Sequence, residues 1–317
     1  MTDNRVSAII TAYNHEHFIS DAITSVLAQT RPVDELVIID DGSTDDTLKV
    51  VSRFLEKGVR YIWQTNLGEG MARNRGIQET SGEYIAFLDA DDIWLEDKTQ
   101  KQLDFLQTHP DVAMVSGLGW WLEIETDRRW LFGLSLKQLS KIQQDMMIHN
   151  NFGNTSMVFL RRSILNEVGF FDPSLRWGTE WDMWTRIVSQ HKVSVIPDPV
   201  IIYRRHQSNI SLTGGWEQDT CYWTISKRAI TKYIPAWQRP FLLARSWSNI
   251  TLSRAYYAFE HKCPRQKQIA YATGALIAYP FEKSVEKLKV FIRAIIGKNL
   301  YQRGRQMFTP WIKKAPP

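Results

Sequence analysis

The sequence is poor in cysteine and lacks a long apolar run. Cys221 and Cys263 are the only cysteines among 317 residues. Because they also lack metal-ligand spacing, we expect no disulfide framework and two reduced, buried thiols. No apolar stretch reaches the ~18 residues that a membrane-spanning helix needs, and the best candidate, residues 269–280, is short and contains Gly274. The first residues are polar and lead directly into a strand-like run, so we expect neither a secretory signal nor a membrane crossing.

Three widespread motifs are also missing. A dinucleotide-binding site needs G-x-G-x-x-G directly after the first strand, where this chain reads Ala12-Tyr13-Asn14-His15-Glu16. The glycine pair Gly68 and Gly70 comes only after the third predicted strand. A P-loop and a G-x-S-x-G nucleophile elbow are absent as well. These absences argue against a Rossmann dehydrogenase, a P-loop nucleotide hydrolase and a serine hydrolase.

The charge of the chain is unevenly distributed. Hydrophobic residues make up 44% and charged residues 23%, which is ordinary for a globular protein with one large domain and an appendage. The net charge is +5, yet residues 281–317 hold nine Lys or Arg against two Glu, so the remainder is slightly acidic. The basic character therefore belongs to the C-terminal segment. We expect no nucleic-acid partner for residues 1–280.

Short β-rich runs alternate with amphipathic helices along the first part of the chain. The periodicity predicts strands at 6–12, 36–39, 59–63 and 84–88, and helices at 18–27, 44–55 and 69–80. This alternation predicts an α/β fold whose parallel sheet is covered by helices on both faces. After residues 214–215 the pattern becomes helical, and helices at 241–260 and 266–278 predict a small bundle.

Polar residues follow three of these strands. Thr11 to Asn14 follow the first, Asp40 and Asp41 the second, and Asp89 and Asp91 the fourth. The carboxyl ends of parallel strands form one edge, where such folds bind ligands, so we expect these residues to lie together. A helix cap would account for Ser43 with Asp46, and a tight turn for Gly42. Capping does not account for both Asp40 and Asp41, so one of them is expected to accept hydrogen bonds from a ligand.

The run Phe87-Leu88-Asp89-Ala90-Asp91-Asp92 ends an apolar strand in three carboxylates. In extended backbone Asp89 and Asp91 face the same side, which suits Mg²⁺ or Mn²⁺ held against a diphosphate. The alternative is an acidic turn that caps the next helix, and Asp92 is expected to be such a helix-start residue without chemistry.

Taken in order, several motifs resemble the inverting glycosyltransferases of family 2, which have the GT-A fold. They are VSAIITAYN at 6–14, VIIDDGSTD at 37–45, NLG at 66–68, ARN at 72–74, GEYIAFLDADD at 82–92, VGFFD at 168–172 and YRRH at 203–206. The resemblance covers about residues 6–211. It implies a GT-A type, Rossmann-like, mostly parallel sheet flanked by helices in residues 1–215, followed by a helical, basic C-terminal region in residues 216–317. Within the first domain, residues 1–92 would form the nucleotide-sugar half and residues 93–215 the acceptor half.

The resemblance also implies a nucleoside-diphosphate sugar donor and a Mn²⁺ or Mg²⁺ cofactor. The donor-contacting residues would be Thr11, Tyr13, Asn14, Asp41, Arg73 and Asp89. Asp41 would accept a hydrogen bond from the nucleobase. For Arg73 the alternative is a solvated or phosphate-facing charge on a helix. Asp91 would be the main metal ligand, with Asp89 shared between ribose and metal and His206 as a third ligand. Arg204 or Arg205 is the alternative group for neutralising phosphate.

Two carboxylates compete for the role of general base. The family usually reads Glu-Asp-Trp-Asp where this chain has Thr179-Glu180-Trp181-Asp182, so Glu180 stands at the position of the usual Asp base and is one methylene longer. If Thr179 is the N-cap, Asp182 would complete a capping box and pair with Arg186 one turn on. Glu180 would lie exposed in the first helical turn, and we favour it as the base over Asp182.

The implied function is metal-dependent, inverting transfer of a sugar to a hydroxyl of a glycan or lipid-linked glycan in cell-surface polysaccharide biosynthesis. The alternative is a catalytically inactive GT-A module that binds nucleotide or glycan within an assembly complex. Five tryptophans of the acceptor half could stack on sugars or belong to the core: Trp120, Trp121, Trp177, Trp181 and Trp184.

A basic, amphipathic helix is expected at the start of residues 281–317. Its apolar face would include Leu288, Phe291, Ile292 and Ile295, with lysines between them. The pattern predicts either a helix packed on the domain or peripheral contact with an anionic cytoplasmic leaflet. We therefore expect a cytoplasmic protein, located in solution or at the inner face of the membrane.

Overall fold

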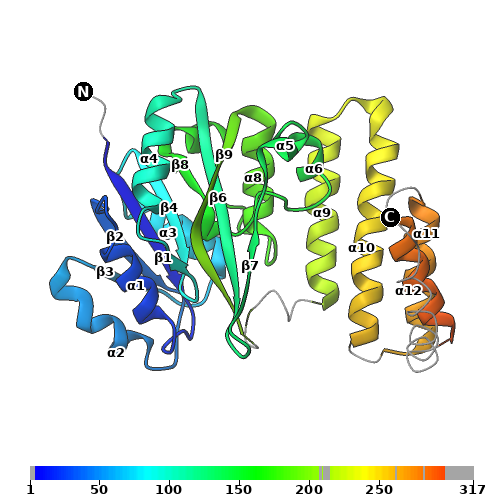
Figure 1. Cartoon of the computed structure of the whole chain (residues 1–317), viewed down its shortest axis with the longest axis horizontal. Coiled ribbons are helices and arrows are strands. Elements are labelled where there is room, and N and C mark those ends of the chain that lie inside the picture. Colours follow the sequence, from blue (N-terminus) through cyan, green and yellow to red (C-terminus); the bar gives the residue numbers. More distant parts are fainter. Residues whose placement is uncertain (1–3, 207–208, 210–214, 261–262, 281–282, 297–317) are drawn as a thin grey trace, which may run out of the picture. The chain divides into compact units, whose positions relative to one another are not determined.

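The computed structural model describes residues 4–206, 209, 215–260, 263–280 and 283–296 (Figure 1). The chain divides into two compact units, residues 1–213 and 214–317, which are described separately. The assignment of residues 1–92 to the donor and 93–215 to the acceptor stays a prediction.

The first unit is built on one sheet with the strand order β3-β2-β1-β4-β8-β6-β9-β5, and β7 pairs with β6 outside this path. The strands are β1 (Val6–Ala12), β2 (Glu35–Asp40), β3 (Arg60–Trp63), β4 (Tyr84–Asp89), β5 (Ile93–Trp94), β6 (Val112–Glu123), β7 (Arg128–Phe132), β8 (Phe159–Arg161) and β9 (Lys192–Arg205). Strands β3, β2, β1 and β4 are all parallel. Beyond them, β8 runs antiparallel to β4 and β6, while β9 runs parallel to β6.

Helices and strands alternate up to β4, as the sequence predicts, and the later helices of this unit follow no strict alternation. The helices are α1 (Ile19–Leu27), α2 (Thr47–Val51), α3 (Glu69–Gln78), α4 (Lys98–Thr108), α5 (Leu136–Leu139), α6 (Ile142–Met146), α7 (Leu165–Val168) and α8 (Thr179–Gln190). The predicted strands and helices up to residue 89 are confirmed, with end shifts of a few residues. Ser43 is not a cap, because α2 begins only at Thr47 with Asp46 at the N-cap position and no side-chain capping bond.

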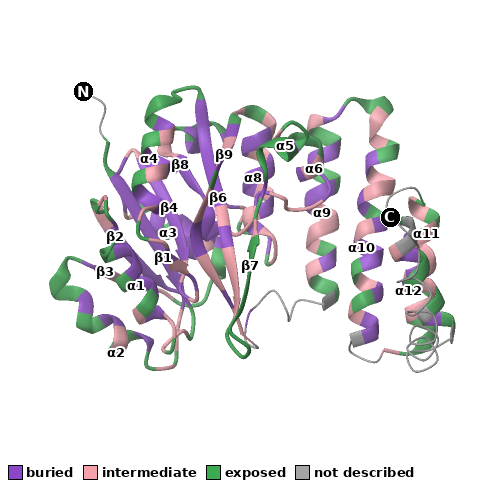
Figure 2. Ribbon diagram, in the orientation of Figure 1, coloured by how far each residue is buried: buried purple, intermediate pink, exposed green. Residues whose placement is uncertain are grey.

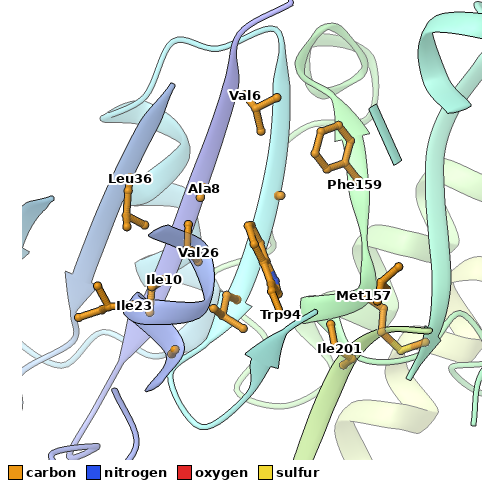
Figure 3. Close-up of a cluster of buried hydrophobic side chains, with 14 of the residues drawn as sticks. Val6, Ala8, Ile10, Ile23, Val26, Leu36, Trp94, Met157, Phe159 and Ile201 are labelled. Carbon is orange, nitrogen blue, oxygen red and sulfur yellow. The ribbon is translucent and has the colours of Figure 1, made fainter. Parts of the chain in front are cut away.

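Both faces of the central strands are buried (Figure 2). On one face, Val6, Ala8 and Ile10 of β1 pack with Ile23 and Val26 of α1 in an apolar cluster, since alternate strand residues point to the same side (Figure 3). On the other face α3 lies directly on β1. A Cβ at Gly76 would come within 2.3 Å of Ile9 Cγ2, so only glycine permits this approach.

The second unit is a helical bundle, as predicted. It contains α9 (Gly215–Tyr233), α10 (Arg239–Glu260), α11 (Arg265–Ala278) and α12 (Ser284–Ile296). Its apolar core comes from α10, α11 and α12 and includes Leu252, Ala255, Phe259, Ala272, Ala275, Val290 and Ala294. Hydroxyl groups join the helices, with Ser226 Oγ donating to Ser246 Oγ at 2.6 Å and Ser248 Oγ to the Ala275 carbonyl at 2.7 Å.

Helix α12 packs with only part of the apolar face that the sequence pattern indicates, since Phe291 of that face lies against the bundle core. Its buried residues include Lys287, Val290 and Ala294, and Lys287 Nζ donates to the Tyr279 carbonyl. Leu288, Ile292 and Ile295 of the predicted apolar face are 39–49% exposed. In the part of the chain that is described, no helix is both long and apolar enough to cross a membrane. Residues 297–317 of the basic segment lie outside the described residues.

Candidate active site

The polar strand ends meet at one edge of the sheet, as the sequence predicts. Thr11 of β1 is in register with Asp89 of β4, and Ala12 with Asp40 of β2. Two main-chain bonds extend this edge beyond the strands: Asp41 N donates to the Ala12 carbonyl at 2.8 Å, and Ala90 N to the Thr11 carbonyl at 3.2 Å. The donor residues inferred from the three strands are therefore neighbours.

Asp41 is 4% exposed and holds the loop that leads into α3. Its Oδ1 accepts from Gln64 Nε2 at 2.7 Å and from Leu67 N at 2.9 Å, while Oδ2 accepts from Gly68 N at 2.8 Å. A carboxylate has about four acceptor positions, so most of its capacity is used within the protein. Its contact with a nucleobase stays a prediction.

Both carboxylate oxygens of Asp40 likewise accept hydrogen bonds from within the protein. Its Oδ1 accepts from Ser43 N at 2.7 Å and its Oδ2 from the Tyr61 hydroxyl at 2.7 Å. Between the two aspartates and Ser43, Gly42 adopts φ +89°, and a Cβ there would approach Asn66 N to 2.8 Å. The segment 40–43 is thus a tightly bonded turn that fixes the entrance to the site.

The first strand end offers two more accessible groups. Tyr13 is 44% exposed, whereas Thr11 is 9% exposed. Asn14 has a left-handed backbone with φ +57°, which asparagine tolerates better than most residues. Its backbone N donates to Ser43 Oγ at 2.8 Å, and its Oδ1 accepts from Thr44 N at 2.8 Å. Asn14 therefore fastens the loop after β1 to the loop after β2.

Asp91 contacts polar side chains from two separate segments, the loop after β1 and the stretch that follows β9. Its Oδ2 lies 3.2 Å from His206 Nε2, 3.8 Å from His15 Nε2, and accepts from Asn209 Nδ2 at 3.0 Å. Phe18 stacks on His206 with ring centroids 4.4 Å apart. This arrangement brings the predicted ligands Asp91 and His206 together, and adds His15.

The environment keeps Asp91 ionised. Burial by itself would raise its pKa, but hydrogen bonds and charge from His15 and His206 outweigh burial and hold the pKa of Asp91 below its usual range. Arg204 is 6% exposed, donates through Nε to the Asp91 carbonyl at 2.5 Å and pairs with Asp21 at 2.6 Å. Its guanidinium therefore supports the Asp91 backbone.

Asp92 does not start a helix. It is fully buried, its Oδ2 accepts from Ser156 Oγ at 2.6 Å, and the chain continues into β5 before α4 begins at Lys98. Burial, together with the charges of Asp91 and Asp89, raises the pKa of Asp92 well above its ordinary value. Ser156 Oγ also accepts from Asp89 N at 3.0 Å, so this serine ties the acidic turn to the segment before β8.

Arg73 forms the centre of a second group of charges. It is 1% exposed, and its Nη2 bonds to Asp89 Oδ1 at 2.9 Å and to Glu69. Its Nη1 donates to Thr179 Oγ1 at 3.4 Å, at the start of α8. Arg73 Nε has no hydrogen-bond partner among the described residues. A solvated Arg73 is therefore excluded, and one guanidinium links α3, β4 and α8.

Glu180 lies in the first turn of α8, next to this group. Desolvation raises its pKa above the ordinary value, while the charge of Arg73 and a hydrogen bond from Asn150 oppose the rise and Asp89 adds to it. The residue is half-buried. A carboxylate with a raised pKa in a partly open site has the properties of a general base.

Asp182 has a structural partner. Its Oδ2 accepts from Arg186 Nε at 2.8 Å, so the predicted ion pair is confirmed. The predicted capping box is wrong, because the N-cap is Gly178 in left-handed conformation and no side chain caps the helix. Arg186 also donates to the Phe170 carbonyl at 2.8 Å, and the pair therefore fixes the loop before α8.

The burial of Arg73 leads to a prediction about stability. Replacing Arg73 with Ala leaves Asp89 and Glu69 without their cationic partner, and we expect the free energy of unfolding to fall by about 3 kcal/mol. Urea denaturation followed by circular dichroism measures this change. Arg75→Ala is the matched control on the same helix, because Arg75 is 50% exposed and pairs with Glu79 at the surface. The control should change stability by less than about 1 kcal/mol, and equal losses in both variants would contradict the role of Arg73.

Sequence reasoning missed three residues of the site. His15 and Asn209 contact Asp91, and Glu69 pairs with Arg73 with its side chain 41% exposed. His15 carries a partial signal, since it directly follows the polar end of β1. The positions of Asn209 and Glu69 depend on contacts between distant segments, which no local pattern reveals.

The residues present fit a divalent cation that arrives with a diphosphate. Among the described residues there is no group of three or more His, Cys, Asp or Glu that could hold a metal alone. Cations such as Mg²⁺ are often held by one or two carboxylates together with substrate phosphates. Asp91 with His206 supplies such an incomplete set, whereas Arg73 already holds Asp89 Oδ1.

Comparison with known proteins agrees with this geometry. The protein-family model described as "Glycosyl transferase family 2" matches residues 7–169, which is over half of the chain. An uncharacterised glycosyltransferase of Nostoc sp. is 32% identical over 221 residues, covering 65% of this chain and 66% of the relative. The Escherichia coli protein WfgD, named a UDP-Glc:α-D-GlcNAc-diphosphoundecaprenol β-1,3-glucosyltransferase, is 32% identical over 214 residues, covering 67% of this chain and 81% of WfgD.

A solved structure shows the same fold. Staphylococcus aureus TarS (residues 1–349), crystallised with UDP-GlcNAc, superposes with a TM-score of 0.65 at 18% identity, covering 92% of this chain and 81% of TarS. The expected GT-A fold and the resemblance drawn from the motifs are confirmed. The chain belongs to glycosyl transferase family 2.

Proposed function

We propose that this chain transfers a sugar from a nucleoside-diphosphate sugar to a hydroxyl of a glycan or lipid-linked glycan, with inversion and with the help of a divalent cation. The observation that carries the proposal is the position of Glu180. It adjoins Arg73, which holds Asp89 on the donor side of the same site.

The chemistry requires two charges of opposite kind. The acceptor hydroxyl must lose a proton as it attacks the sugar, and the half-buried Glu180 would accept it. Asp91 and His206, with Asp89, would hold the cation. When bound, that cation supplies Lewis-acid stabilisation of the negative charge that develops on the leaving diphosphate.

Names of the relatives support the choice of substrates. WfgD is named for a UDP-glucose donor and an undecaprenol-linked acceptor, and the TarS crystal contains UDP-GlcNAc. We infer a uridine-diphosphate sugar as donor and a lipid-linked glycan as acceptor, in cell-surface polysaccharide assembly. Cytoplasmic location and peripheral membrane contact through residues 281–317 stay predictions, supported by the net positive charge of that segment.

A thermal-shift screen tests the proposal. UDP-glucose, UDP-GlcNAc and GDP-mannose would each be added with Mn²⁺, with Mg²⁺ or with EDTA. A ligand at about 100 times its Kd stabilises the folded state by about 2.7 kcal/mol. We expect a rise in Tm of a few degrees with at least one UDP-sugar plus cation, and a much smaller rise in EDTA, since Asp91 and the diphosphate share the cation.

Free glucose and free GlcNAc, each with Mn²⁺, serve as ligand controls and should leave Tm unchanged. A shift equal in EDTA and in Mn²⁺ would count against metal dependence. If no nucleotide sugar shifts Tm under any condition, the catalytic proposal fails and the inactive GT-A module becomes the better description.

A further inference from the structure

We propose that the β6–β7 hairpin carries a second carbohydrate subsite, which binds sugar units of the acceptor beyond the unit that receives the transferred sugar. This inference rests on the proposed function and names where the acceptor chain extends. Its evidence is a set of side chains that face one another across three neighbouring strands.

Strand register places three aromatic residues in one line. Trp121 of β6 lies directly opposite Trp130 of β7 and opposite Tyr203 of β9. Side chains directly opposite in neighbouring strands share a face of the sheet, so these three form a continuous aromatic row. The next line on the same face, two residues away on each strand, is charged and consists of Arg205, Glu123 and Arg128.

Ring contacts within the aromatic row hold the Trp121 side chain in place. The rings of Trp121 and Trp130 are stacked, with centroids 5.4 Å apart and planes 17° apart. Tyr203 meets Trp121 edge-on at 5.0 Å, and the Arg205 guanidinium lies 5.8 Å from the centre of the Trp121 ring. Trp130 remains 40% exposed although it stacks on Trp121. A rigid indole thus presents apolar surface at the outer strand of the hairpin.

The row lies at the end of the sheet where the reaction is proposed. Strand β8 is antiparallel to both β4 and β6, so β6 runs in the same direction as β4 and its last residues lie toward the edge that carries Asp89. Figure 1 shows β6 and β7 running together to that end of the unit. Strand β9 connects the aromatic row to the group around Asp91, because Arg205 is followed by His206, whose Nε2 is 3.2 Å from Asp91.

The chemistry of the two rows suits a sugar chain. The C–H face of a pyranose is apolar and packs on an aromatic ring, while its hydroxyl groups point outward around the rim. Arg205 and Arg128 donate hydrogen bonds and Glu123 accepts them, which matches hydroxyl groups in both roles. Trp121 Nε1 is buried without a hydrogen-bond partner among the described residues and adds an unused donor in the row.

Charge argues against a bilayer as the occupant of this hairpin. The tip, residues 123–129, contains three acidic residues (Glu123, Glu125 and Asp127) and two arginines (Arg128 and Arg129), so it is slightly negative. An anionic leaflet would attract a basic surface and repel this one. Of the five tryptophans that the sequence singled out, Trp181 and Trp184 are buried in the core, Trp177 is half-buried in the loop before α8, and Trp120 and Trp121 belong to the hairpin.

The test measures binding of soluble oligosaccharides by calorimetry, with the full chain saturated with UDP and Mn²⁺. The probes are linear oligomers of glucose, of N-acetylglucosamine and of mannose, each from one to six units long. We expect at least one series to bind more tightly as its length increases to three units. In Trp130→Ala the longer members should bind about tenfold more weakly, which equals about 1.4 kcal/mol, and the monomer should be unaffected.

Two further variants separate the aromatic face from a general effect on the hairpin. Trp130→Tyr keeps an aromatic ring and should retain most of the affinity. Leu131→Ala removes an apolar side chain that is 47% exposed and points to the opposite face of the same strand, and it should behave as the wild type.

Three results would overturn the subsite: no series binds the wild type, Trp130→Ala binds every oligomer as the wild type does, or the variant loses co-sedimentation with phosphatidylglycerol vesicles instead of sugar binding. UDP binding is recorded in the same experiment. If UDP binds and oligosaccharides do not, the subsite alone is wrong, whereas loss of UDP binding in the wild type counts against the proposed function itself.

Discussion

Replacing Glu180 with Gln is expected to lower kcat by a factor of about 10²–10⁴ while the Kd for the donor stays unchanged. The amide would keep the shape of the side chain but could not accept the proton of the acceptor hydroxyl. The measurement is UDP release from the nucleotide sugar that stabilises the chain most, with donor affinity determined separately by calorimetry. A loss of donor affinity with unchanged kcat would contradict the role of Glu180.

The pH profile provides a second readout for Glu180. A base is active only when deprotonated, and the pKa of Glu180 is raised above its ordinary value of 4.5. Activity should therefore fall as the pH decreases, and this decline should begin at a higher pH than for an ordinary Glu. Asp182→Asn is the matched control, because Asp182 is paired with Arg186 at 2.8 Å. That variant should lose some stability, keep kcat within about tenfold and retain the acid limb.

Replacing Asp91 with Asn is expected to reduce cation-dependent turnover by at least about 100-fold, because a bound cation is worth several kcal/mol to the leaving diphosphate. The substitution removes the carboxylate charge around which His15, His206 and Asn209 gather. Calorimetry with the UDP-sugar should show that Mn²⁺ no longer strengthens donor binding. Transfer should stay low even when the donor is saturating.

A surface substitution controls for the Asp91 experiment. Asp46→Asn is equally conservative, and Asp46 pairs with Lys49 with its side chain 60% exposed. It should leave both donor binding and turnover unchanged. Circular dichroism and Tm measurements would show whether each variant is folded. If Asp91→Asn is folded and still turns over the donor with its normal Mn²⁺ dependence, Asp91 is not the metal ligand.

The fold of residues 4–92 was predictable because its signals are local. Three of the four strands there are short apolar runs followed at once by a polar end group, as in Ile39 with Asp40 and Leu88 with Asp89. Parallel pairing then brings these ends to one edge without further information. The helices between them follow from their 3.6-residue periodicity.

The fold of residues 93–206 was less predictable, because its strands pair across long stretches of chain. Strand β8 has three residues (Phe159–Arg161) and joins β4 to β6. So short a run carries no reliable period. Arg73 shows the same limit at the level of one side chain: its sequence position indicates a helix, but its burial depends on Thr179, which is 106 residues away in the chain.

The hairpin of β6 and β7 has a consequence for how such a chain can diversify. Strand β7 pairs with β6 alone among the described strands, and residues 124–127 join the two. Insertions or substitutions in this segment therefore need not displace β1, β2 or β4, which bear the donor-side aspartates. If the hairpin carries the proposed subsite, exchanging this one peripheral ribbon would change the acceptor contacts and leave the strands of the donor-side aspartates in place.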